Sequence, residues 1–118
     1  HVAATDLVSR CADGLVGKCG YSPVGIMSAA NAPDSLRTLR AKYPRLFLLV
    51  DGYSAVGANA KNCAYAFDKL GHGAIVCGSG SILRAWQQAP SDGSDYIQHS
   101  QLCVERMKRN ITRYITIL

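Results

Sequence analysis

The sequence lacks any apolar run that approaches about 18 residues, the length that a membrane-spanning helix needs. This absence argues against a helical membrane protein. Acidic residues are also few. The sequence has 8 Asp and Glu against 13 Lys and Arg, which gives a net charge of +5. Neither an aromatic RNA-binding motif nor helix-turn-helix spacing accompanies the basic residues, so we expect no nucleic-acid partner. The positive charge also suits a phosphorylated small molecule.

Paired-cysteine motifs are missing as well. The five cysteines are odd in number and none lies in Cys-x-x-Cys spacing; they are Cys11, Cys19, Cys63, Cys77 and Cys103. This pattern argues against a disulfide framework and against a zinc site. We therefore expect no metal, no cofactor and a reducing, cytoplasmic location. Cys63 and Cys77 lie in apolar patterns and are expected to be buried as small hydrophobic residues.

What is present fits one small domain spanning residues 1–118, with 48% hydrophobic residues, too many for a disordered chain. The chain does not begin with Met, and its first residues already follow a helical pattern. This suggests a piece of a longer protein, or a processed or trimmed chain.

Strands alternate with helices along the chain, which predicts an α/β fold with parallel strands and right-handed crossovers. The apolar run Leu46–Val50 is typical of a strand buried on both faces. Pro33 suits the first turn of a helix that Asn31 would cap. We expect strands over Val24–Met27, Arg45–Val50 and Ala74–Cys77, and helices over Val2–Cys11, Pro33–Tyr43, Asn59–Leu70, Ser81–Gln88 and Asp95–Tyr114.

Two groups of basic residues lie on predicted helices or beside them. One group follows the first strand and the other lies near the C-terminus; they are Arg37, Arg40, Lys42 and Arg45, and Arg106, Lys108, Arg109 and Arg113. Such residues usually form solvated helix faces, and we expect this more than a nucleic-acid surface.

Ligands of parallel α/β folds meet the carboxyl ends of the strands, where three loops qualify: Ser28–Ala32, Asp51–Ala58 and Gly78–Ser81. The third loop runs from a strand directly into a helix, and its glycines let backbone amides approach an anion. The alternative is a tight turn in which Ser81 caps the helix. A dinucleotide fingerprint is weak because its third glycine is Leu83.

Asp51 is the only ionisable acid of the second loop, and it suits a general base or an acceptor for a sugar hydroxyl. More often such a residue caps a turn. His72 lies between two glycines in a predicted turn, and no Ser/His/Asp or Cys/His arrangement follows from the spacing of the histidines.

The stretch Gly17–Trp86 resembles the C-terminal half of orotidine 5'-monophosphate decarboxylases of the bacterial type 2 branch. Gly17-Lys18-Cys19-Gly20-Tyr21-Ser22 and the following Val24-Gly25 look like the sixth unit of that barrel. The segment Phe47–Gly57 is similar to its seventh strand and phosphate loop, and Gly71–Val76 with Ser79 resembles its eighth strand. The resemblance implies three parallel strands with flanking helices, that is, a partial (β/α) TIM-type barrel.

The same comparison shows departures at the positions where the family binds its nucleotide. Asp51 stands in place of a proline, Val56 of a glutamine, Cys77 of an asparagine and Gly80 of an arginine. Arginine grips phosphate through a planar fork that glycine cannot replace. Nothing matches the family's catalytic Asp-x-Lys-x-x-Asp cluster, so no catalytic residue is assigned. We expect only weak binding of phosphate or a nucleotide, through backbone amides of Gly57, Ala58, Ser79 and Gly80.

Three functions stay open: a part of a working decarboxylase, a non-catalytic binder of a phosphorylated ligand, and an assembly module. Three strands cannot close a barrel, and an open apolar face is prone to pairing. We therefore expect the chain to form a homo-oligomer, to pair with the missing N-terminal half, or to fold its first or last helix across the open face, the last helix being the better candidate.

Overall fold

The computed structural model describes residues 2–53 and 60–117 of the chain. Three strands form its sheet: β1 (Gly25–Ala29), β2 (Phe47–Asp51) and β3 (Ala74–Val76). All pairs are parallel and the order is β1-β2-β3. The predicted α/β fold with three parallel strands in sequence order is therefore confirmed.

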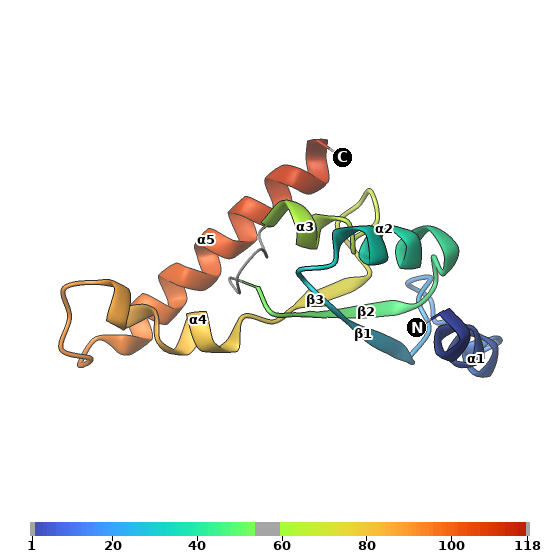
Figure 1. The fold of residues 1–118 in the computed structure, drawn as a ribbon, viewed down its shortest axis with the longest axis horizontal. Coiled ribbons are helices and arrows are strands. Elements are labelled where there is room, and N and C mark those ends of the chain that lie inside the picture. The colour runs from blue at the N-terminus through green and yellow to red at the C-terminus, as the bar shows by residue number, and fades with distance from the viewer. Residues whose placement is uncertain (1, 54–59, 118) are drawn as a thin grey trace.

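Helices lie between and around these strands. The chain begins with α1 (Val2–Ala12), and α2 (Pro33–Lys42) connects β1 to β2. The short α3 (Ala60–Ala64) precedes β3; α4 (Ser79–Leu83), the 3-10 helix η1 (Ala85–Gln88) and the long α5 (Tyr96–Ile117) follow it. Figure 1 shows α2, α3 and the C-terminal half of α5 above one side of the sheet, as right-handed crossovers require.

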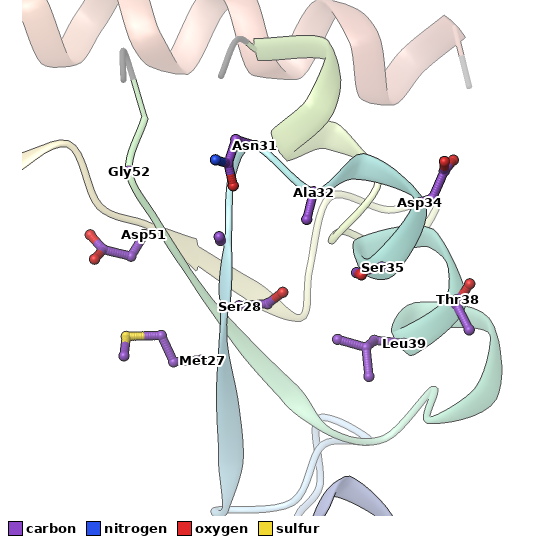
Figure 2. A pocket seen from close by; sticks show the side chains of 11 residues that line it. Met27, Ser28, Asn31, Ala32, Asp34, Ser35, Thr38, Leu39, Asp51 and Gly52 are labelled. Atoms are coloured by element: carbon purple, nitrogen blue, oxygen red, sulfur yellow. The ribbon is translucent and has the colours of Figure 1, made fainter. Parts of the chain in front are cut away.

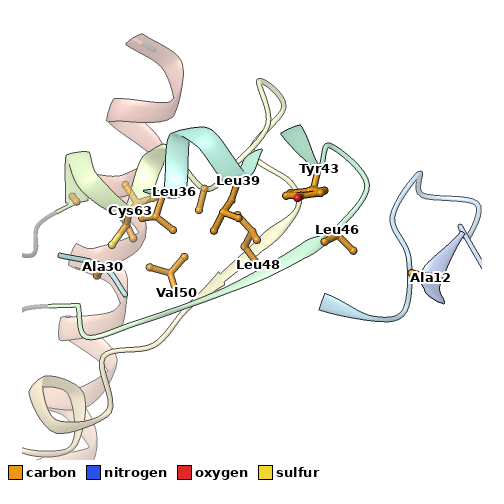
Figure 3. Packing of buried hydrophobic residues seen from close by; sticks show 12 residues of the cluster. Ala12, Ala30, Leu36, Leu39, Tyr43, Leu46, Leu48, Val50 and Cys63 are labelled. Carbon is orange, nitrogen blue, oxygen red and sulfur yellow. The ribbon is translucent and has the colours of Figure 1, made fainter. Parts of the chain in front are cut away.

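The core fills the space between that side of the sheet and its helices (Figure 3). Leu48 and Val50 of β2 are fully buried, as is Leu36 of α2. Cys63 packs with them as a small apolar residue, whereas Cys77 is only half-buried. Helix α5 joins this layer through Met107 and Ile111, which are both 7% exposed.

The opposite face of the sheet is open, which contradicts one predicted arrangement. Met27, Leu49 and Ile75 are adjacent in register across the three strands and are 63%, 37% and 55% exposed. The prediction that α5 folds across this face is wrong, because α5 packs on α3 and α4 on the other side. Its apolar side chains Met107 and Ile111 are buried on that other side and do not cover the open face.

Several predicted boundaries are also wrong. The helix predicted over Asn59–Leu70 ends at Ala64 among the described residues, because Asp68 accepts hydrogen bonds from the amides of Leu70 and His72 and holds a turn. Asn31 does not cap α2, since Ala32 precedes that helix and no side chain caps it. The second strand begins at Phe47 and not at Arg45. The carbonyls of Pro44 and Leu46, just before it, accept hydrogen bonds from the Arg40 side chain of α2.

Within residues 2–53 and 60–117, no helix is long and apolar enough to cross a membrane.

Candidate functional site at the carboxyl edge of the sheet

The predicted loops do meet at one edge of the sheet. The Ala30 amide donates to the Asp51 carbonyl at 2.7 Å, which ties the end of β1 to the end of β2. The Tyr53 amide donates to the Cys77 carbonyl at 3.1 Å, which ties the end of β2 to the segment after β3. Parallel pairing thus brings together three loops that are far apart in the sequence.

A pocket of about 600 Å³ opens at the carboxyl end of β1, beside α2. Figure 2 shows the Ser28 side chain pointing toward α2 and Ser35, while Met27 and Asp51 point to the other side of the strand. The polar side chains therefore lie on both sides of β1 and do not converge on one point. A site that orients a small ligand needs such convergence, so this pocket assigns no catalytic group.

Asp51 is the last residue of β2, not the first residue of a loop. Its side chain is exposed and borders the pocket, and no described residue donates a hydrogen bond to its carboxylate. The interpretation of Asp51 as a turn cap is therefore not supported by the described residues. Its possible role as a base or sugar-hydroxyl acceptor stays a prediction.

The third loop is shorter than predicted, because Ser79 and Gly80 already belong to the first turn of α4. Ser79 is exposed and Gly80 is half-buried. Ser81 does not cap the helix as its N-terminal residue, a position that Gly78 takes. Instead, the Ser81 hydroxyl donates to the Gly78 carbonyl at 2.8 Å. The two other predicted ligand residues, Gly57 and Ala58, lie outside the described residues.

Arg84 lies against Gly80, one turn along the chain. Its Nη2 atom is 2.9 Å from the point that a Cβ on Gly80 would occupy. Arg84 is exposed, and within the described part of the chain its guanidinium has no hydrogen-bond or ion-pair partner. A guanidinium without a described partner thus covers Gly80, as the spacing of four residues on a helix allows.

The sequence analysis did not identify Tyr53 as a residue that packs at the carboxyl edge of the sheet. Its Cβ atom lies 3.5 Å from the Cβ position of Gly78, and the Met107 methyl lies 3.1 Å from the same point. Burial raises the pKa of Tyr53, although a hydrogen bond with Asn110 acts in the opposite direction. Gly78, which precedes α4, is therefore packed between the segment after β2 and α5, and a Cβ there would require its neighbours to shift.

The amino end of the sheet contains a different group of polar residues, one of which, Arg40, was predicted to lie on a solvated helix face. Arg40 is half-buried, and its guanidinium donates to the carbonyls of Ala66, Leu46 and Gly73 at 2.8, 3.0 and 2.7 Å. The interpretation of Arg40 as a solvated residue is wrong, because its guanidinium donates to carbonyls of three chain segments, one of which, that of Gly73, also accepts from the Leu48 amide.

Tyr21 and Asp68 complete this network. The Tyr21 hydroxyl donates to Asp68 Oδ2 at 2.6 Å, and the Arg40 guanidinium lies 5.5 Å from the Tyr21 ring centre. Burial and the bond to Asp68 raise the pKa of Tyr21 to about 12. Burial opposes ionisation of Asp68, but hydrogen bonds from Tyr21 and two backbone amides outweigh it and lower the pKa of Asp68.

His72 is exposed near this network, and its amide donates to Asp68 Oδ1 at 2.9 Å. It lies at the amino end of β3 and therefore away from the predicted ligand loops. No cluster of three or more His, Cys, Asp or Glu side chains that could hold a metal ion occurs among residues 2–53 and 60–117.

Comparison with known proteins shows which family resembles this chain. No family model matches the chain. It is 26% identical over 106 residues to the orotidine 5'-phosphate decarboxylase of Clostridium novyi, a match covering 90% of this chain and 37% of the relative. The enzyme of Caldicellulosiruptor bescii is 31% identical over 101 residues, or 86% of this chain and 32% of the relative. The enzyme of Rhodopirellula baltica is 35% identical over 85 residues, which cover 72% of this chain and 28% of the relative.

The chain thus spans about a third of the length of these curated relatives. The matches lie in the C-terminal portion of the relatives, where a (β/α) barrel has its last strands. The three parallel strands and flanking helices agree with that position. This chain belongs to the orotidine 5'-phosphate decarboxylase family and corresponds to the C-terminal portion of its members.

Proposed function

We propose that this chain supplies the phosphate-binding part of an orotidine 5'-phosphate decarboxylase-like protein of pyrimidine biosynthesis and does not decarboxylate that nucleotide alone. The observation that carries the proposal is the kinship with decarboxylases, joined to a sheet edge where three strand ends are hydrogen-bonded together. Ligands of parallel α/β folds meet such an edge.

The phosphate would lie near the start of α4. Backbone amides of Ser79 and Gly80, with those of Gly57 and Ala58, would donate to its oxygens. The Arg84 guanidinium, 2.9 Å from the Cβ position of Gly80, is close enough to supply the charge that the family's arginine supplies from the neighbouring position. The exposed Arg84 has no described partner that would compete with the phosphate.

Catalysis would need groups that this sequence does not contain. No Asp-x-Lys-x-x-Asp cluster occurs, and Val56 and Gly80 replace side chains that grip the nucleotide in the family. Loss of one group that stabilises a transition state costs on the order of 3 kcal/mol, and here several are absent. We therefore expect no release of CO₂ from orotidine 5'-monophosphate above background with the purified 118-residue chain.

Titration with inorganic phosphate and with uridine monophosphate, followed by amide chemical shifts, tests the binding part. We expect shifts at Ser79 and Gly80 with a Kd no better than about 1 mM, roughly 4 kcal/mol. The variant Arg84→Gln should bind several-fold more weakly, whereas Arg109→Gln on the exposed side of α5 should bind as the parent does. Absence of shifts in α4 at high ligand concentration would refute the site.

A second candidate function is a non-catalytic assembly module, and the open sheet face favours it. Met27, Leu49 and Ile75 present a continuous apolar row, and β1 and β3 each pair with one strand only among the described residues. Such a face is prone to association, either with a second copy or with an N-terminal half-barrel. Sedimentation of the pure chain tests this: a stable monomer across a wide concentration range would exclude self-association.

We also propose a reducing, cytoplasmic location. The support is that all five cysteines are free thiols, and that burial raises the pKa of the Cys63 thiol to about 11, which keeps it protonated and inert.

A further inference from the structure

Helix α5 presents one row of side chains to the carboxyl edge of the sheet. The row consists of residues spaced by three or four positions, which lie on one side of a helix: Ser100, Cys103, Met107 and Asn110. Figure 1 shows the N-terminal half of α5 beside α4, and the two helices are in contact. The row therefore faces the segment that carries the proposed phosphate site.

The first two residues of the row hold the last turn of α4. The Ser100 hydroxyl donates to the Ile82 carbonyl at 2.8 Å, and the Cys103 thiol, a weak donor, donates to the Ser81 carbonyl at 3.6 Å. The last carbonyls of a helix have few partners within the helix, although the Ile82 carbonyl also accepts from the Arg84 amide. Because α4 has only five residues, a length that is not stable alone, it depends on α5 for its position.

The other two residues of the row hold the segment before α4 and the end of β2. The Met107 methyl lies 3.1 Å from the point that a Cβ on Gly78 would occupy, and the Tyr53 Cβ lies 3.5 Å from the same point. Tyr53 is half-buried, and its hydroxyl shares a hydrogen bond with Asn110. The Tyr53 amide also donates to the Cys77 carbonyl, so this residue joins the ends of two strands to α5.

The two helices use different groups of the edge. Helix α5 reaches the carbonyls of Ser81 and Ile82 and the Tyr53 hydroxyl. The amides of Ser79 and Gly80 belong to the first turn of α4, where a helix leaves its amides without internal partners. Side chains of α5 can therefore fix the direction of these amides without competing with a ligand for them.

We propose that Ser100 and Asn110 of α5 are positioning residues for the phosphate site. Ser100 acts through the Ile82 carbonyl, Asn110 acts through the Tyr53 hydroxyl, and neither contacts the ligand. This inference rests on the proposed function, because it concerns the same edge of the sheet. It adds α5, which contributes none of the strand-end loops, to the parts of the chain that determine the affinity for phosphate.

The test uses the full 118-residue chain and inorganic phosphate. Amide shifts of Ser79 and Gly80 give the affinity, and urea unfolding gives the free energy of unfolding of each variant. We expect Ser100→Ala and Asn110→Ala each to weaken phosphate binding by about fivefold while the chain stays folded, since each removes one hydrogen bond. The control Gln101→Ala, an exposed neighbour on α5, should bind as the parent does.

Two further variants distinguish positioning from a general loss of stability. Ser100→Thr keeps the hydroxyl and should restore the parent's affinity. Tyr53→Phe removes the partner of Asn110, so the double variant with Asn110→Ala should bind no more weakly than either single variant. Without ligand, hydrogen exchange of the Ile82 and Arg84 amides, which donate within α4, should quicken in Ser100→Ala and not in Ser100→Thr.

Parent-like phosphate affinity in Ser100→Ala and Asn110→Ala would overturn the inference. So would equal weakening in Ser100→Ala and Ser100→Thr, or additive effects of Tyr53→Phe and Asn110→Ala. Absence of phosphate shifts in the parent chain would refute the phosphate site itself, and the positioning role with it. That outcome is distinguishable from the others, because they all require a parent chain that binds.

Discussion

The two ends of the sheet differ in how their polar groups are used. At the amino end, Arg40 donates to three carbonyls from separate segments, and Tyr21 donates to Asp68. At the carboxyl end, Asp51 and Arg84 are exposed and have no partner among the described side chains. The amino end is thus satisfied internally, whereas the carboxyl end keeps its polar groups available.

This difference separates stability from ligand binding within one sheet. In (β/α) barrels the residues at the amino ends of strands hold the fold, and those at the carboxyl ends meet the ligand. A change at the amino end should therefore lower the free energy of unfolding, and a change at the carboxyl end should leave it nearly unchanged. Each of the following variants tests one side of this contrast.

Arg40→Ala should have the largest effect. It leaves the carbonyls of Ala66 and Leu46 without their Arg40 donor, while the Gly73 carbonyl keeps the amide of Leu48. Each unsatisfied buried group costs about 1–3 kcal/mol, so we expect a loss of about 3 kcal/mol. Urea unfolding measures it. The control Arg37→Ala, which removes only a guanidinium 4.4 Å from the Tyr65 ring centre, should cost about 1 kcal/mol or less. Equal losses would contradict the special role of Arg40.

Gly73→Ala should be the next most damaging change. Gly73 has φ +96°, and a Cβ there would lie 2.5 Å from the Tyr21 hydroxyl oxygen. We expect a loss of about 2–3 kcal/mol from backbone strain and the displaced ring. Gly71→Ala provides the matched control, because Gly71 has φ +82° but no atom within 4 Å of its Cβ position, so it isolates the strain alone. A Gly71→Ala loss as large as that of Gly73→Ala would show that contact with Tyr21 adds nothing.

Tyr21→Phe should cost about 1–2 kcal/mol at neutral pH, since it removes a hydrogen bond to a carboxylate. The pH dependence identifies the cause. The pKa of Tyr21 is raised from 10.0 to about 12, so its contribution is present below pH 10 and is lost as the pH rises to about 12. The pKa of Asp68 is lowered, so its contribution is present above the ordinary carboxyl pKa and is lost at more acidic pH.

Thermal unfolding across the pH range measures both slopes. In Tyr21→Phe the loss between pH 10 and 12 should become smaller, and the acid-side loss should shrink because Asp68 keeps only its backbone donors. Unchanged slopes on both sides would separate Tyr21 from Asp68 energetically.

Gly80→Ala should have the smallest effect on stability, within about 1 kcal/mol, because alanine favours the helix while its Cβ displaces only the flexible end of Arg84. Phosphate binding should nevertheless fall several-fold, since the guanidinium moves away. Gln87→Ala, an exposed change in η1, serves as the control for both readouts. Unaltered phosphate affinity in Gly80→Ala would remove Arg84 from the site.

Particular residues show how far sequence reasoning reached. The apolar run before Asp51 predicted a buried strand, and β2 indeed buries Leu48 and Val50; but Leu49, in the same run, lies on the open face. The Gly78–Ser81 motif predicted a strand-to-helix turn, and α4 begins there, two residues earlier than expected. The apolar spacing favoured a helix over Asn59–Leu70. The structure has a turn at its end instead, because the Asp68 carboxylate accepts hydrogen bonds from the amides of Leu70 and His72.

The sequence by itself determined the parallel α/β order and the family, because both depend on local apolar periodicity and on short motifs that survive in the chain. Only the tertiary structure decided that Arg40 is internal, that Arg84 covers Gly80, and that α5 packs on α3 and α4 and leaves the sheet open. Those outcomes depend on contacts between segments that are far apart in the sequence, through their carbonyls, carboxylates and apolar faces. The spacing of residues along the chain does not predict such contacts.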